Sequence, residues 1–295
     1  MDKLVLSVLL CYFITEGGTA QKKEKSGFAT FHYDMVPEVG EASWNQYSVA
    51  FNKSLFSFKR QELGFVAGYR NTTYDFFETA IPSVTKAFEE IHLITGGFFY
   101  RHDLQRNWGF EVTFSPVISS TLDSGISGAD FQYGGNANIH KIWNTNDGKV
   151  TALKLGAGYG TALGQPSFYP VFSFMTTFNR WSLELGFPGS SITYDITPRH
   201  DLCLNAEYLG SYANIQNGLP IGQEVYNDSK LEYEAIDLGV THKYRLQPNF
   251  TSVLRMGYLM DNNLRLLSGN EQQLNEFNTS ESIYFSMGLI LNFNN

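Results

Sequence analysis

The chain has 295 residues, of which 43% are apolar, 15% aromatic and only 17% charged, with a formal net charge of −8. This acidic balance argues against a nucleic-acid-binding surface, which would be basic, and 24 Phe and 17 Tyr against 9 Pro exclude a disordered or collagen-like chain. The mean hydropathy is −0.21, and no apolar run approaches the ~20 residues that a membrane-spanning helix needs.

The first twenty residues have the layout of a secretory signal peptide. Lys3 supplies a weak positive charge, residues 4–14 form a short apolar run, and Gly18-Thr19-Ala20 offers small residues before a cleavage site. A buried N-terminal strand or short helix is the alternative. Cleavage after Ala20 would leave residues 21–26 as a periplasmic tether. Cys203 would then be the only cysteine, so no intramolecular disulfide is expected.

Residues 27–295 are predicted to form an all-β domain, an antiparallel transmembrane β-barrel of about fourteen strands. Apolar and polar side chains alternate with period two, which is typical of strands with two different faces. Many runs reach ten or more residues, as a tilted transmembrane strand requires (~9–11), whereas strands of globular sheets average about 5–6. The polar face carries Gly, Ser, Asn and Thr with isolated charges, as expected inside a barrel. In chain order the predicted strands are 27–35, 45–58, 61–76, 88–101, 106–118, 130–142, 150–161, 168–178, 180–187, 190–197, 200–213, 231–245, 249–262 and 281–293.

The lengths of the connections support this strand count. Bacterial barrels have even strand numbers and alternate short periplasmic turns with longer outer loops. Fourteen strands keep that alternation from end to end and place both termini in the periplasm. Merging 180–197 into one strand and dropping 27–35 gives twelve, which is the alternative. The long connections are 36–44, 77–87, 119–129, 214–230 and 263–280, and 162–167 and 188–189 are outer loops that stay short.

Several short motifs lie in the second half of the chain. They are Lys154 to Gly160 (KLGAGYG), Tyr169-Pro170, Phe178 to Trp181 (FNRW), Phe187-Pro188 and Ile192 to Tyr194 (ITY). On these motifs the sequence resembles an uncharacterised outer-membrane barrel family of Bacteroidetes-type bacteria, known only as a domain of unknown function. The resemblance extends over most of the mature chain. It implies a barrel in the outer membrane of a Gram-negative bacterium and transfers no functional residue.

The last predicted strand also resembles the signal that barrel-assembly machinery recognises, an alternating strand that ends in an aromatic residue. Its apolar face is predicted to meet lipid and to consist of Ile283, Phe285, Met287, Leu289, Leu291 and Phe293. Asn294-Asn295 follow Phe293, which departs from the usual pattern of ending on the aromatic residue itself. Phe293 is the predicted assembly signal, and outer-membrane lipid and the assembly machinery are the predicted partners.

The face opposite to the lipid is predicted to line the lumen. The inward candidates are Glu111, His140, Lys154, Glu184, Glu207, Asp237, Lys243 and Arg255. Opposite charges on neighbouring strands can pair across a barrel interior or line a solute pathway, since both kinds of barrel have polar interiors. The leading hypothesis is passage or binding of a small solute. The alternative is a non-conducting structural or surface-interaction barrel.

No motif indicates a cofactor, a metal site or a catalytic centre. Gly156, Gly158 and Gly160 fall on one face of a strand and lack the GxGxxG spacing of a dinucleotide-binding loop. The six histidines are scattered without metal-ligand spacing. His242 and Ser252 are predicted neighbours across a hairpin on the outward face, where a Ser–His pair would suit a lipid-hydrolysing enzyme. No third residue is evident, so this stays a remote alternative.

Overall fold

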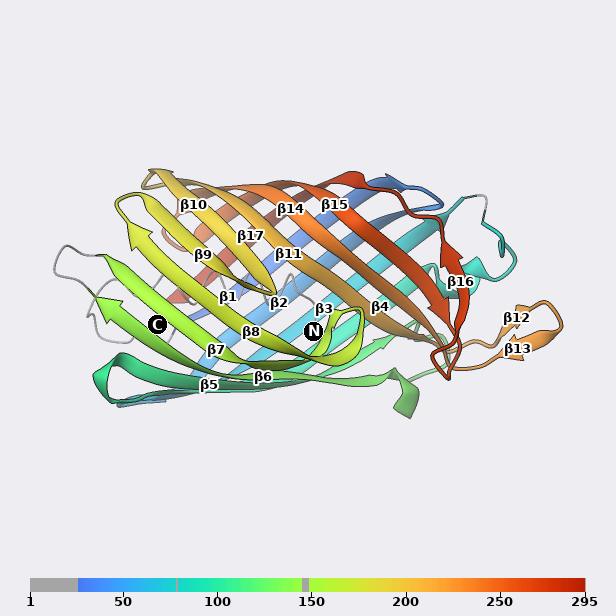
Figure 1. Cartoon of the computed structure of the whole chain (residues 1–295), viewed down its shortest axis with the longest axis horizontal. Helices are drawn as coiled ribbons and strands as arrows, with labels where there is room; N and C mark the ends of the chain where they lie inside the picture. The colour runs from blue at the N-terminus through green and yellow to red at the C-terminus, as the bar shows by residue number, and fades with distance from the viewer. Residues whose placement is uncertain (1–25, 78, 145–148, 295) are drawn as a thin grey trace.

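The computed structural model describes residues 26–77, 79–144 and 149–294 and shows an elongated barrel (Figure 1). Fourteen long strands form one closed antiparallel sheet, which confirms the predicted fold class. The predicted signal peptide and residues 21–25 of the tether lie outside the described residues. The ring strands are β1 (Ser26–Val39), β2 (Ala42–Phe58), β3 (Gln61–Phe76), β4 (Glu90–Asp103), β5 (Trp108–Ser120), β6 (Phe131–Asn144), β7 (Val150–Leu163), β8 (Gln165–Phe178), β9 (Trp181–Phe187), β10 (Gly189–Thr197), β11 (His200–Ile215), β14 (Ser229–Gln247), β15 (Phe250–Leu267) and β17 (Ser282–Asn294).

The two terminal strands close the ring. β1 pairs antiparallel with β17 from Ser26↔Asn294 to Met35↔Phe285. Closure removes the open edges that lipid cannot hydrogen-bond. The twelve-strand alternative is therefore wrong: β1 belongs to the ring, and Pro188 separates β9 from β10 as two strands.

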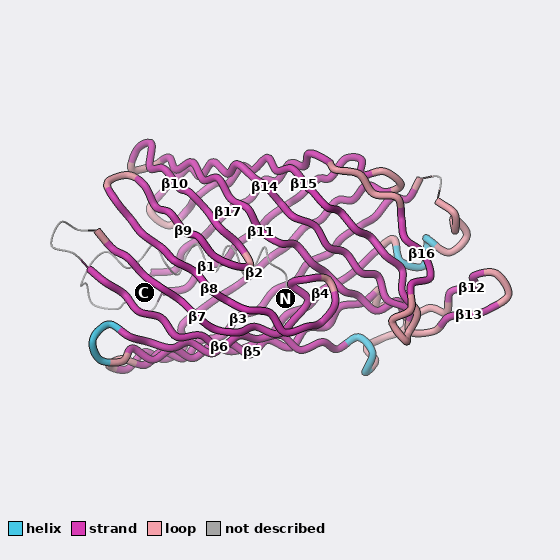
Figure 2. Tube along the Cα trace, in the orientation of Figure 1, coloured by secondary structure: helices cyan, strands magenta, loops and turns pink. Residues whose placement is uncertain are grey.

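The two ends of the barrel differ in their connections, as Figure 2 shows. We call them the short-turn end, which includes the turns at 59–60, 179–180 and 198–199, and the long-loop end. The long-loop end carries the 3-10 helices η1 (Thr85–Phe88) and η3 (Gly128–Asp130), the hairpin of β12 (Leu219–Ile221) and β13 (Glu224–Tyr226), and β16 (Gln273–Phe277). A third 3-10 helix, η2 (Gln105–Asn107), lies at the short-turn end. No helix in these described ranges is long and apolar enough to cross a membrane.

Some predicted loops are shorter than expected. The predicted loop 36–44 is only a turn at Gly40-Glu41, because β1 and β2 continue almost to it. Gly40 has a φ of +71°, a conformation that glycine adopts without steric cost. The predicted loops 214–230 and 263–280 likewise contain strand residues, since β14 and β15 project beyond their neighbours and short strands pair above the ring.

Alternation of exposure along β17 confirms its predicted inward and outward faces. Exposed apolar side chains alternate with buried residues that face the lumen, such as Tyr284 and Ser286. The exposed set, at 39–58% exposure, is Ile283, Phe285, Met287, Leu289 and Leu291.

Phe293 lies where β17 closes onto β1. Its ring is 5.7 Å from that of Phe51 on β2, and its register partner is Gly27. We expect Phe293→Asp to reduce the amount of assembled protein in the outer membrane strongly. The direct energetic cost of a charge near the interface is only about 0–1 kcal/mol, so a large loss would reflect failed recognition by the assembly machinery. The variant refolded in detergent is the control, and a comparable loss of stability there would contradict this interpretation.

The lumen is not polar along its whole length. At the long-loop end, inward side chains of the strands pack with Phe88 of η1 and Leu219 of β12, both of which are fully buried. We call this cluster the outer core. It consists of Val36, Ala42, Trp44, Tyr74, Val84, Phe88, Ile91, Ala213, Ile215, Leu219, Leu231, Tyr233, Ala235, Leu259, Leu264, Leu266, Phe277 and Tyr284. The outer core therefore places packed apolar side chains in the lumen at this end.

Candidate functional site

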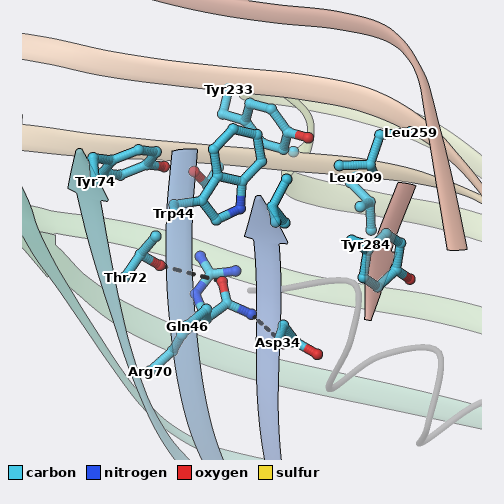
Figure 3. Close-up of a pocket in the computed structure, with 13 residues that line it drawn as sticks. Asp34, Trp44, Gln46, Arg70, Thr72, Tyr74, Leu209, Tyr233, Leu259 and Tyr284 are labelled. Atoms are coloured by element: carbon cyan, nitrogen blue, oxygen red, sulfur yellow. Dashed lines mark hydrogen bonds between the residues drawn. The ribbon is translucent and has the colours of Figure 1, made fainter. Parts of the chain in front are cut away.

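A partly open cavity of about 70 Å³ in the lumen is lined in part by residues of the outer core. One water requires roughly 10–15 Å³ of such space, so the cavity has room for several waters or a small solute. Figure 3 shows the Trp44 ring with Tyr74 to its left and Tyr233 above it, and Arg70 and Asp34 below. The lining residues are Asp34, Val36, Trp44, Gln46, Arg70, Thr72, Tyr74, Leu209, Gly210, Ser211, Tyr233, Leu259 and Tyr284.

The sheet places these residues together from distant parts of the chain. Asp34, Gln46 and Thr72 are successive register partners on β1, β2 and β3, so they form a row across three strands. Thr72 donates to Gln46 Oε1 at 3.2 Å, and Gln46 Nε2 donates to Asp34 Oδ2 at 2.9 Å. Closure of the ring brings β11, β14 and β15 to the opposite side of the cavity. Polar and aromatic side chains of β1–β3 therefore face Leu209, Tyr233 and Leu259 across the cavity.

Asp34 has unused hydrogen-bonding capacity in this cavity. Asp34 is only 5% exposed. Within the described ranges its Oδ1 has no hydrogen-bond partner of good geometry. The Ser286 hydroxyl lies beside the carboxyl group. A buried acceptor without a partner is costly. A solute that carries a hydroxyl or ammonium group would satisfy this oxygen.

A buried ion-pair network lies next to the cavity on β11, β14, β15 and β17. The Arg255 guanidinium donates to Glu207 Oε1 at 3.0 Å and also to Asp237 Oδ2, to which the Tyr284 hydroxyl donates at 2.8 Å. The side chains of Arg255, Glu207 and Asp237 are 12%, 4% and 0% exposed. We call these three residues the Arg255 triad. Three of the predicted lumen residues thus meet in one network.

A second network occupies the other wall. Arg101 on β4 pairs with Glu111 on β5 and, at 3.5 Å, with Glu62 on β3. We call these residues the Arg101 triad. In the fourteen-strand ring, β4 and β11 are about half a circumference apart. Two networks, each with one arginine and two carboxylates, therefore stand on opposite walls.

The other predicted lumen residues are spread along the inner wall. His140 and Lys154 are register partners on β6 and β7. Glu184 accepts a hydrogen bond from Ser173 Oγ at 2.7 Å, and Lys243 is in register with Asp201. The sequence interpretation did not include Asp34, Trp44 or Arg70, although the same period-two count places them on the inward face of β1–β3.

The proposed Ser–His pair is not formed. His242 is in register with Leu254, whereas Ser252 is opposite Tyr244 and donates to its carbonyl oxygen at 3.3 Å. His242 instead stacks on His200, with 3.1 Å between His200 Nδ1 and His242 Nε2. The turn lies at residues 248–249, where Gln247 pairs with Phe250, and not at 246–248 as a hairpin with His242 opposite Ser252 requires. Among the described residues, no group of three His, Cys, Asp or Glu side chains suits a metal ion.

Asp130, at the end of η3, lies at the long-loop end of the barrel. It joins the β5–β6 loop to the end of β11 through hydrogen bonds. Burial opposes its ionisation, but hydrogen bonds from Ser120, the Ser127 N–H, Asn214 and Gln216 outweigh that effect and lower its pKa from 3.8 to about 2. The Asn214 and Gln216 amides donate to it at 2.7 and 2.9 Å.

The lowered pKa predicts how this contact responds to pH. A carboxyl group whose folded pKa is depressed stabilises the fold above its unfolded pKa, and that contribution is lost as pH falls from about 4 to about 2. We expect Asp130→Asn to lower the free energy of unfolding by about 1.5–3 kcal/mol at pH 7, since hydrogen bonds to a charged group are lost. Guanidinium unfolding in detergent at pH 7 and pH 2 measures this. A difference between wild type and variant that is as large at pH 2 as at pH 7 would contradict it.

Searches for related sequences found no matching family model and no matching curated protein. Solved structures with similar shape include an outer membrane channel from Pseudomonas putida F1, with 9% identity and a TM-score of 0.47, covering 94% of this chain and 98% of that one. The translocator domain of autotransporter NalP from Neisseria meningitidis has 11% identity and a TM-score of 0.40 (98% and 95% covered). The toluene transporter TbuX from Ralstonia pickettii has 10% identity and a TM-score of 0.39 (92% and 90% covered). These similarities identify neither a family nor a function.

Proposed function

We propose that this chain is an outer-membrane β-barrel of a Gram-negative bacterium that binds a small solute inside its lumen and is closed at the long-loop end. The observation that carries the proposal is the cavity beside the outer core, where Asp34 Oδ1 has no good partner. Its aromatic walls suit a solute with a ring or short apolar body. Its carboxylate suits a hydroxyl or ammonium group on that solute.

The outward surface supports the membrane location. The exposed side chains of the ring strands are apolar over most of their length, as lipid requires, and the antiparallel ladder closes on itself. Trp108, Trp143 and Trp181 are 43–44% exposed and all stand near strand ends at the short-turn end. They match the aromatic girdle that such barrels place at a membrane interface.

Electrical recording in planar bilayers tests the closed lumen. We expect the wild-type protein to show no steady open-pore conductance, because packed apolar side chains of the outer core lie in the lumen. A variant with Trp44→Ala and Tyr233→Ala is expected to conduct, since both rings pack edge to face at 5.2 Å in that core. Trp108→Ala, an outward tryptophan, is the matched control. Steady conductance of the wild type would support an open pore instead. A double variant that shows no conductance would support a structural barrel.

The Ser–His pair that a lipid-hydrolysing barrel would need is not assembled, since His242 is opposite Leu254 and Ser252 is opposite Tyr244. We expect no hydrolysis of phospholipid or acyl-ester substrates by the purified protein, and the same result for Ser252→Ala. Activity in the wild type that disappears in this variant would return the pair to consideration.

A further inference from the structure

The ring contains one place where neighbouring strands are not joined by a backbone ladder. β9 pairs with β8 only from Phe172↔Phe187 to Phe178↔Trp181, and β10 pairs with β11 only from Gly189↔Glu207 to Thr197↔His200. Figure 1 shows the short β9–β10 hairpin ending about halfway along the barrel, while β11 continues. Residues 165–171 of β8 and 209–213 of β11 keep their ladders with β7 and β14, but no ladder among the described strands joins the edges that face each other. We call this place the seam.

Isolated hydrogen bonds and a strand connection close the seam instead of a ladder. The Tyr208 N–H donates to the Pro188 carbonyl at 3.1 Å, and Gln132 Nε2 donates to the Tyr212 carbonyl. The β7–β8 tip, residues 161–165, lies against the outward face of β11. A Cβ atom on Gly210 would lie 2.2 Å from the Thr161 carbonyl oxygen, so the tip needs glycine there. Gln165 Nε2 donates to Glu232 Oε2 at 3.2 Å and holds the tip on β14.

The seam lies directly beside the cavity. Leu209, Gly210 and Ser211 line the cavity and are also the first β11 residues beyond the end of the β10 ladder. On the outward side, the rim of the seam is apolar, with Phe168 81%, Phe172 46% and Tyr208 40% exposed. A membrane-facing apolar rim and the solute cavity are thus on the two sides of the same stretch of wall.

Opening the wall costs least at the seam. Elsewhere, separating two strands breaks consecutive backbone hydrogen bonds and exposes polar groups to hydrocarbon, at several kcal/mol each. At the seam no ladder needs to break. Displacing the β7–β8 tip disturbs side-chain packing and the two hydrogen bonds of Gln165, one from its side chain and one from its backbone, to Glu232.

We propose that the seam is a lateral entrance through which a membrane-dissolved amphiphile, with an apolar chain or ring and a hydrogen-bond-donor head, passes from the bilayer into the cavity. This inference rests on the proposed function, because it needs the cavity to bind a solute. The apolar rim admits the body of the molecule, and Asp34 receives the head.

Quenching of Trp44 fluorescence tests the route. The chain has 4 Trp, and replacing the outward Trp108, Trp143 and Trp181 by Phe leaves Trp44, which lines the cavity. The protein is reconstituted in vesicles with one of three probes. They are a short-chain fatty alcohol brominated on its chain, a phospholipid brominated at the same depth, and the water-soluble tribromoethanol. Bromine quenches tryptophan only at close range. The phospholipid stays in the bilayer, so it measures any quenching of Trp44 from outside the barrel.

We expect the fatty alcohol to quench Trp44 at least several-fold more than the phospholipid. Gly210→Ala is expected to speed this quenching several-fold, because the added Cβ displaces the β7–β8 tip. Gly68→Ala is the matched control, since its Cβ would meet no atom closer than 3.5 Å, and it should leave the rate unchanged. Gln165→Ala, which removes the side-chain hydrogen bond to Glu232, is the second opening variant if Gly210→Ala does not fold.

The other outcomes separate the two proposals. Quenching by tribromoethanol but not by the fatty alcohol would leave solute binding in place and overturn the lateral entrance. Fatty-alcohol quenching that neither Gly210→Ala nor Gln165→Ala changes would place the route elsewhere and also overturn it. Lack of quenching by both alcohols would overturn the binding cavity itself and, with it, the entrance.

Discussion

Replacing Arg255 by Met is expected to lower the free energy of unfolding by about 3–5 kcal/mol, which is the usual cost of removing one partner from a buried ion pair. The substitution leaves Glu207 and Asp237 adjacent and without their shared cation, and their side chains are 4% and 0% exposed. Two neighbouring buried carboxylates repel each other and cannot be hydrated. Guanidinium unfolding of the detergent-solubilised barrel, followed by tryptophan fluorescence, measures the loss.

Two companion variants distinguish charge from packing. Adding Glu207→Gln and Asp237→Asn to Arg255→Met removes the unpaired charges and should recover most of the lost stability. Arg245→Met, an exposed arginine on the same strand pair, should change stability by no more than about 0.5 kcal/mol. An Arg255→Met variant as stable as the wild type would mean that water from the lumen hydrates the triad.

Leu289→Arg is expected to lower stability by about 2–4 kcal/mol and to reduce the amount of heat-modifiable barrel in the outer membrane. Leu289 is an exposed residue in the middle of β17, and an arginine near the membrane midplane costs that amount. Its register partners are Phe31 on β1 and Ser252 on β15, so the change leaves the ladder intact.

The matched control for this variant is Ser286→Asn, three residues earlier and on the inward face. Ser286 is in register with Asp34 and Arg255, and an amide there can still form hydrogen bonds. Membrane levels close to those of the wild type are expected. If Ser286→Asn were as damaging as Leu289→Arg, then the inward and outward faces assigned to β17 would be reversed in the membrane.

The period-two pattern by itself determined the fold class and the two faces of the clearest strand, and together with the lengths of the connections it favoured fourteen strands over twelve. The reason is local: in a strand each side chain points to one of two sides, so a run such as 281–293 carries its own orientation. The same count placed Glu207, Asp237 and Arg255 on one face. It also places Asp34 and Arg70 on the inward face, but the pattern does not show that these two residues line one cavity.

Only the tertiary structure decided which inward residues meet and where the wall is incomplete. The Arg255 triad depends on the register of β11, β14 and β15, and the position of the turn at residues 248–249 was enough to separate His242 from Ser252. The outer core combines strands with Phe88 and Leu219 from connections that show no strand period. The seam arises because β9 and β10 are shorter than β8 and β11, so residues about forty positions apart face each other with no ladder between them. Such contacts are set by the ring closing on itself, a constraint that no local pattern in the chain contains.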